Sequence, residues 1–234
     1  MKKLMIGLLA AGCLSSPLAM AGNNVKVEIT NLSNAIYFTP LLVSAHDRHT
    51  HLFQPGVAAT ASLQAMAEGG DISGLANDLS AVGANNVENP AGGLLAPGAS
   101  ATAAMEMNRG NRYLSIVGML LPTNDGFVGL DALPIPRAGG SYTYYLNGYD
   151  AGTEANDEVI TGGGAPGVPG IPADPGGNSG AGASGVTGAD YNKTVHIHRG
   201  IVGGASSDLD VAVHKWLNPV AKVVVTVRGH GHDD

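Results

Sequence analysis

Hydrophobic and polar residues alternate along several short segments of this chain. Near the start, Val25, Val27 and Ile29 are separated by charged or polar residues, and a period of two is typical of a strand with one buried face. Similar alternation, or a run of β-branched and aliphatic residues, predicts further strands over 35–45, 99–107, 113–121, 141–146, 194–198 and 220–227. Pro40 predicts an edge or a bulge in the first of these. The pattern therefore predicts an all-β protein, specifically an antiparallel β-sandwich.

Three segments depart from this strand pattern. Residues 57–68 are rich in alanine and precede two glycines, which favours a short helix, and 71–79 favours another turn or two. Residues 162–188 are dense in Gly, Pro, Ser and Ala, with almost no large apolar side chain. Such a segment cannot offset its ordering entropy by burial. We therefore expect a flexible loop over 162–188, inside a single domain formed by 22–234.

The first 21 residues have the order of a secretory signal. Lys2 and Lys3 precede a short apolar stretch, and Ala19-Met20-Ala21 supplies small residues for cleavage. The apolar stretch is shorter than the roughly 20 residues that a membrane-spanning helix needs. We therefore predict cleavage after Ala21 and a periplasmic or secreted protein. A membrane anchor and lipidation at Cys13 are the alternatives.

Composition limits the partners of the mature chain. Removing Lys2 and Lys3 from 12 basic residues leaves 10 against 19 acidic ones, a net charge of −9. A chain this acidic repels nucleic acid, and no later segment reaches membrane-spanning length. Cys13 is the only cysteine, so no disulfide is expected after cleavage. The expected partner is a protein, glycan or lipid ligand.

Two segments place carboxylates at predicted strand ends. Asp125 lies in a predicted loop over 121–130, after the most apolar strand, and Asp150 and Glu154 lie in a second predicted loop over 149–154. Gly152 allows a sharp turn between them, so that both can point at one centre. Calcium takes six to eight oxygen ligands, several of them carboxylates. The spacing alone leaves two alternatives, a calcium site and solvated turns whose aspartates accept from backbone N–H groups.

Histidines provide a second candidate site. His46, His49 and His51 crowd one segment, and His196 and His198 share one strand. Imidazoles together with carboxylates bind zinc or copper, so convergence of the two groups would favour a metal-dependent hydrolase. Nothing in the spacing fixes a third ligand for any pair, so exposed polar side chains are the favoured alternative. No Gly-x-Ser-x-Gly, phosphate-binding loop or His-Glu-x-x-His helix is present, which favours a non-enzymatic binding module. A purely structural surface protein is the third alternative.

Several short motifs occur in a fixed order along the chain. They are Phe38-Thr39-Pro40; Pro122, Asp125, Val128, Gly129 and Leu130; Asp150-Ala151-Gly152-Thr153-Glu154; Val195-His196-Ile197-His198; and Trp216-Leu217-Asn218-Pro219-Val220-Ala221. In this order the chain resembles the spondin N-terminal domain family, including its bacterial members, from about Val25 to Val227.

The resemblance implies a fold and a site. It implies an antiparallel β-sandwich like calcium- and lipid-binding modules, an extracellular setting as in matrix proteins, and calcium ligands at Asp125, Asp150 and Glu154. Two positions differ from the animal pattern. Gly126 stands where an aromatic residue is usual, and Glu154 stands where aspartate is typical.

Overall fold

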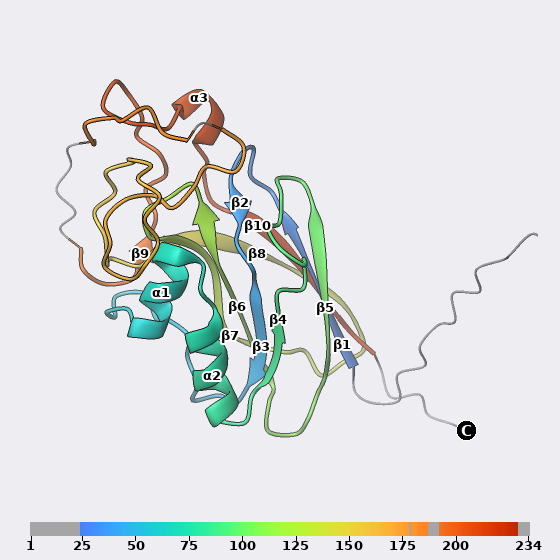
Figure 1. The fold of residues 1–234 in the computed structure, drawn as a ribbon. Coiled ribbons are helices and arrows are strands. Elements are labelled where there is room, and N and C mark those ends of the chain that lie inside the picture. The colour runs from blue at the N-terminus through green and yellow to red at the C-terminus, as the bar shows by residue number, and fades with distance from the viewer. Residues whose placement is uncertain (1–23, 178, 187–191, 229–234) are drawn as a thin grey trace, which may run out of the picture.

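The computed structural model describes residues 24–177, 179–186 and 192–228 (Figure 1). The predicted signal and its cleavage site therefore lie outside the described residues. In the part of the chain that is described, no helix has both the length and the apolar character needed to cross a bilayer.

Strands make up most of the described fold. They are β1 (Asn24–Asn31), β2 (Tyr37–Phe38), β3 (Leu42–His46), β4 (Asn85–Glu88), β5 (Ser100–Glu106), β6 (Tyr113–Leu121), β7 (Gly126–Pro134), β8 (Gly140–Asp150), β9 (His196–Ile197) and β10 (Ala221–Val227). The helices are α1 (Ala61–Gly69), α2 (Ser73–Ala81) and α3 (Val211–His214).

The long strands form one antiparallel sheet that curls until its ends approach. Its order is β4-β3-β6-β7-β8-β10-β1-β5, with β2 on β6 and β9 on β8. Each pair of these strands is antiparallel. Asn85 on β4 donates to the carbonyl of Glu106 on β5 (2.8 Å) and so links the two ends. The predicted antiparallel all-β sandwich is confirmed, in a nearly barrel-like form.

The main core fills the inside of this curled sheet. Val25, Val27 and Ile29 on β1 are fully buried, as their period of two predicts. β6 is buried on both faces, because one face contacts the main core and the other lies under helices. This double burial explains its nearly continuous apolar sequence.

Helices α1 and α2 cover the outer face of β3, β6 and β7 (Figure 1). The side chain of Thr60 caps α1 by accepting from the N–H of Leu63 (3.1 Å), and Gly70 ends it in the left-handed conformation. Beneath the helices, Phe127 lies against Phe53 and Tyr149, with ring centroids 5.0 and 5.6 Å away. These contacts fix the start of β7 beside the end of β8.

Several predicted boundaries were wrong. The strand expected over 35–45 is two strands separated by Pro40, because proline cannot donate to a ladder. β4 and β7 were missed altogether. The segment 121–130 was predicted as a loop, yet β7 begins at Gly126. Only four residues therefore connect β6 to β7, and Asp125 is the last of them.

The Gly/Pro-rich segment 162–188 has no helix or strand in its described residues, but it contacts the sandwich. Ile171 is fully buried in the main core and donates its N–H to the carbonyl of Val159 (2.7 Å). Asp174 lies 3.4 Å from His214 on α3, and both are buried. The expectation that this segment has nothing to bury is therefore incorrect at Ile171, although its flexibility elsewhere stays a prediction.

Candidate functional site

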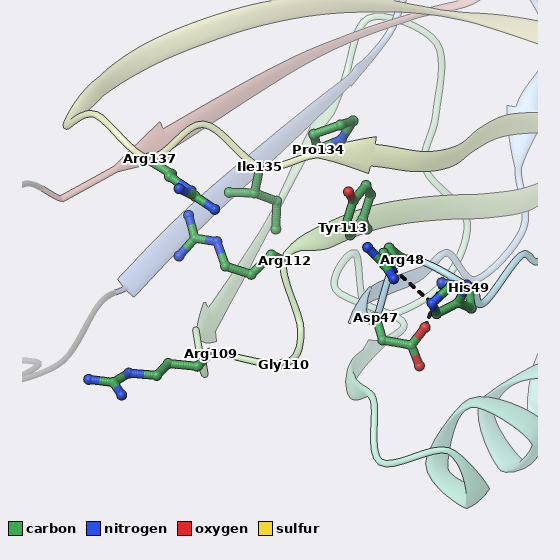
Figure 2. A pocket seen from close by; sticks show the side chains of 10 residues that line it. All are labelled: Asp47, Arg48, His49, Arg109, Gly110, Arg112, Tyr113, Pro134, Ile135 and Arg137. Carbon is green, nitrogen blue, oxygen red and sulfur yellow. Dashed lines mark hydrogen bonds between the residues drawn. The ribbon is translucent and has the colours of Figure 1, made fainter.

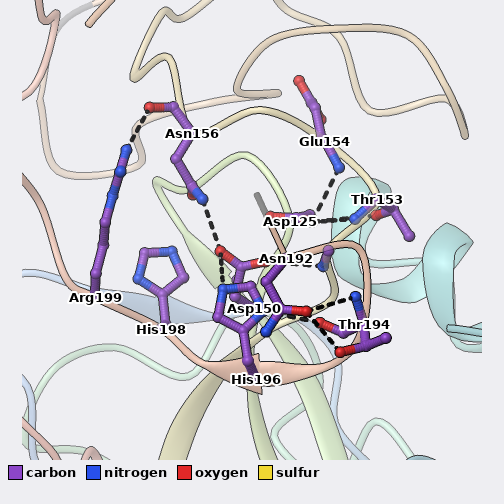
Figure 3. Close-up of polar contacts among 12 residues, drawn as sticks. Asp125, Asp150, Thr153, Glu154, Asn156, Asn192, Thr194, His196, His198 and Arg199 are labelled. Carbon is purple, nitrogen blue, oxygen red and sulfur yellow. Dashed lines mark hydrogen bonds and ion pairs between the residues drawn. The ribbon is translucent and has the colours of Figure 1, made fainter. Parts of the chain in front are cut away.

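Asp125 and Asp150 lie together at one end of the sandwich (Figure 3). Asp150 is the last residue of β8 and pairs with Gly126, the first residue of β7. The N–H of Ala151 then donates to the carbonyl of Asp125 (3.2 Å). Strand register thus brings together two carboxylates that are 25 positions apart in the sequence.

The carboxylate of Asp125 is fully buried, and only one of its two oxygens has hydrogen-bond partners among the described residues. Its Oδ2 accepts from the N–H of Thr153 (2.8 Å), the hydroxyl of Thr153 (3.2 Å) and the N–H of Glu154 (3.1 Å). Its Oδ1 has no hydrogen-bond partner among the described residues. A buried carboxylate oxygen without a partner is costly, so this atom marks a place for a cation or a proton.

Asp150 is better satisfied than Asp125. Its Oδ1 accepts from the N–H of Gly152 (2.8 Å), and its Oδ2 accepts from the side-chain amide of Asn156 (2.7 Å). The Nε2 of His196 on β9 lies 3.6 Å from the same Oδ2. Each carboxylate oxygen of Asp150 therefore has a hydrogen-bond partner.

Burial and the nearby charge of Asp150 raise the pKa of Asp125 to about 7. Burial is the larger cause, because a desolvated carboxylate favours its neutral form. The repulsion from Asp150 adds to it. A divalent cation between the two groups would remove both penalties.

The Glu154 side chain points away from Asp125 (Figure 3). Its Oε1 accepts from the N–H of Gly170 and from the side-chain amide of Asn124 (3.1 Å). Its Oε2 is buried without a partner among the described residues, and burial raises its pKa. Glu154 thus contributes its backbone N–H to Asp125 and its carboxylate to the neighbouring loop.

His198 lies beside Gly126 at the edge of the carboxylate site. Its ring is buried against Trp216, with centroids 4.9 Å apart. Burial lowers the pKa of His198 to about 4, so the ring is neutral near pH 7. Its Nδ1 accepts from the N–H of Gly200 (2.9 Å), which leaves the proton on Nε2. The Val-His-x-His and Trp-x-Asn-Pro motifs therefore meet beside the carboxylates.

At two positions of the site, neighbouring atoms lie so close to the backbone that only glycine fits. A Cβ at Gly126 would come within 2.6 Å of the Thr123 hydroxyl and 3.0 Å of the His198 ring. This contact explains why glycine follows Asp125 in this chain. Gly152 has a φ of +71°, and a Cβ there would lie 2.8 Å from the backbone of Thr194.

We expect Gly152→Ala to destabilise the protein by about 1–3 kcal/mol more than Gly162→Ala, as measured by chemical denaturation. Gly162 is the matched control, because its φ is +76° and nothing lies within 4 Å of its Cβ position. It isolates the left-handed strain, roughly 1–2 kcal/mol, from the steric clash. Equal losses at the two positions would show that Thr194 yields and that the turn is not tightly packed.

The two histidine groups do not converge. His46 pairs with Tyr113 at the start of β6 and contacts Ser115 (Nε2 to Oγ, 2.7 Å), while His51 contacts Asp131 (2.5 Å). His196 pairs with Asp150, beside the end of β6. The length of β6 separates the groups by roughly 25 Å. The geometry that would favour a histidine-dependent hydrolase is absent from the described residues. Ser115, which contacts His46, is fully buried and therefore not accessible to a substrate.

Asn124 and Asn156 are site residues that the sequence analysis missed. Asn124 donates to both Glu154 and Asp157 (2.8 Å to Asp157) and accepts from the N–H of Glu158 (3.2 Å). Asn156 holds Asp150. The only available indication was their position next to the predicted ligands.

The described residues contain no group of three or more His, Cys, Asp or Glu side chains arranged to hold a metal. Of the three predicted ligands, the structure brings together Asp125 and Asp150, while the carboxylate of Glu154 faces 162–188. The open Oδ1 of Asp125 nevertheless fits a hard cation, since calcium completes its shell with backbone carbonyls, amides and water.

The curled antiparallel sheet and the buried carboxylates in its end loops define a β-sandwich module whose polar site lies on connecting segments. The family model of the spondin N-terminal domain (Spondin_N) matches residues 30–160, more than half of the chain, and the chain belongs to this family. The matched region includes Asp125, Asp150 and Glu154, and the motifs after residue 160 lie outside it. No curated protein matches the chain. The family is non-catalytic and indicates an extracellular interaction module.

Proposed function

We propose that this protein is an exported, non-enzymatic binding module that holds a calcium ion at one end of its sandwich. Asp125 and Asp150 are the proposed ligands. Glu154, the third ligand expected from the sequence, supports them by donating its backbone N–H to Asp125 (3.1 Å), while its carboxylate faces 162–188. The observation that carries the proposal is the buried Oδ1 of Asp125, which has no partner among the described residues and lies beside a second buried carboxylate.

The distribution of open oxygens supports this assignment. Three buried side-chain atoms lack a hydrogen-bond partner among the described residues. Two are oxygens of Asp125 and Glu154, and the third is Nε2 of His198. Both oxygens belong to residues predicted as ligands from sequence, and the pKa of each residue is raised mainly by burial. A divalent ion offsets this cost because it supplies a counter-charge where water is excluded.

The function of the ion in this proposal is to fix loops. Asp125 closes the β6–β7 connection, Asp150 ends β8, and Glu154 contacts Gly170 in the Gly/Pro-rich segment. Calcium bound by Asp125 and Asp150 stabilises the arrangement of these segments, because the backbone N–H of Glu154 is tied to Asp125 and its carboxylate to Gly170. The surface that these segments present to a partner then depends on calcium.

Calcium is favoured over a transition metal by the available donor atoms. The site offers the carboxylate oxygens of Asp125 and Asp150, with the side-chain amide of Asn156 beside Asp150, and hard cations prefer oxygen ligands. The His198 ring keeps its proton on Nε2, because Nδ1 is occupied. The proposal is tested by measuring the stability of residues 22–234 with and without calcium, for the wild type and for variants of the three carboxylates.

A further inference from the structure

A second polar site lies at the opposite end of the sandwich, where β6 begins and β7 ends (Figure 2). A cavity of about 470 Å³ opens there. Four arginines line it: Arg48, Arg109, Arg112 and Arg137. They come from three separate connections, so only the fold brings them together.

The charge in this cavity opposes that of the whole protein. The chain contains six arginines and has a net charge of −7. Four of the six line this cavity, and Arg228 lines an adjoining cavity with Arg112 and Arg137. Among the described lining residues Asp47 is the only carboxylate. Such local concentration of one sign in an acidic protein is the electrostatic feature of an anion site.

These guanidinium groups are unneutralised in the part of the chain that is described. No hydrogen bond or ion pair joins the side chains of Arg109, Arg112 or Arg137 to another described residue. The carboxylate of Asp47 accepts from the N–H groups of His49 (2.6 Å) and Thr50 (3.2 Å) in its own turn. Arg48 donates to the ring of His49 (2.8 Å).

Arg112 and Arg137 point toward each other (Figure 2), and both line the same three adjoining cavities. Two guanidinium groups that face each other repel unless an anion lies between them. The backbone holds them in place, because the N–H of Ile135 donates to the carbonyl of Arg112 (2.9 Å). The side chain of Asn108 also accepts from Gly110 and Asn111 (2.9 and 2.7 Å), which orders the preceding turn.

From this cluster we infer that the cavity binds the phosphate group of a phosphorylated ligand. Guanidinium forks bind phosphate oxygens in pairs, and a doubly charged group balances two facing arginines where a single carboxylate does not. The volume lies in the range of small-molecule sites. Tyr113, Pro134 and Ile135 form the remaining wall and would contact the organic part. This inference is independent of the calcium site at the other end.

The inference is tested by calorimetric titration of residues 22–234 with inorganic phosphate and with glycerol 3-phosphate. Both titrations are run in EDTA at constant ionic strength, so that the calcium site has no influence. We expect saturable binding that is tighter for the ester. The Arg109→Gln/Arg137→Gln variant, which alters two exposed side chains, should weaken it about tenfold.

The matched control is Lys215→Gln/Lys222→Gln, which removes the same charge outside the cavity and should leave binding within about twofold. Equal weakening by both double variants, or no binding of either phosphate probe by the wild type, overturns the inference. Phosphatidylcholine vesicles with and without phosphatidic acid identify the source of the phosphate. Binding to phosphatidic acid vesicles that is lost in the arginine variant supports a lipid headgroup as the ligand. Binding to glycerol 3-phosphate without binding to these vesicles supports a soluble phosphate ester.

Discussion

Replacement of Asp125 by asparagine is expected to abolish most of the stabilisation by calcium while leaving the metal-free fold intact. At a calcium concentration 100 times the dissociation constant, binding should stabilise the wild type by about 2.7 kcal/mol. Asparagine keeps the shape of the side chain, and its carbonyl can still accept from Thr153 and Glu154. It removes the charge that a cation needs, as Asp150→Asn should also do.

The comparison with Glu154→Gln makes this test specific. Glutamine changes the charge by the same amount, but the carboxylate of Glu154 is already engaged by Gly170 and Asn124. We therefore expect Glu154→Gln to retain a larger share of the calcium effect than Asp125→Asn. Asp78→Asn, an exposed position on α2, should retain all of it. Thermal denaturation with calcium and with EDTA measures each effect.

One outcome would assign the calcium ion to different residues. If Asp125→Asn keeps the calcium effect and Glu154→Gln loses it, the ion lies among Glu154, Asn124 and Asp157 rather than between Asp125 and Asp150.

Ile171→Ala is expected to lower the free energy of unfolding by about 2–5 kcal/mol, the range for deleting most of a buried isoleucine side chain. Ile171 is fully buried in the main core and bridges to Ile160. Its removal leaves a cavity and also releases the segment that carries Gly170. Urea denaturation measures the change.

Val168→Ala is the control from the same segment, because Val168 is 46% exposed and should change stability by less than about 0.5 kcal/mol. A small effect at both positions would favour the expectation from composition, namely that 162–188 is a flexible loop that contributes little to the core. A large effect at Ile171 alone would show that this side chain attaches the segment 162–188 to the core, although the segment has few other apolar residues.

Local periodicity was sufficient to predict most of the sheet. The alternation in β1 and the continuous apolar run of β6 directly express burial on one face and on two. β7 was missed because its glycines and its aspartate resemble a turn when read without a partner strand. Its pairing with β6 and β8 decides its conformation, and pairing is a non-local property.

The location of the candidate site could be predicted from the sequence, but the orientation of its side chains could not. The positions of Asp125 and Asp150 at strand ends follow from the order of strands, so their proximity could be expected. The direction of the Glu154 side chain depends on Gly170, in a segment whose composition gives no indication of its path. The arginine cavity could not be predicted at all, since its four arginines are spread over 90 positions of the chain.

The most direct test of the calcium proposal is a calorimetric titration of calcium into chelator-treated protein of residues 22–234. We expect one saturable site, weaker binding of magnesium because that ion demands tighter geometry, and loss of the signal in Asp125→Asn. Absence of binding at millimolar calcium would contradict the proposal and would make the two loops turns without a metal. Tighter binding of zinc than of calcium would contradict it as well and would assign the metal to the histidines.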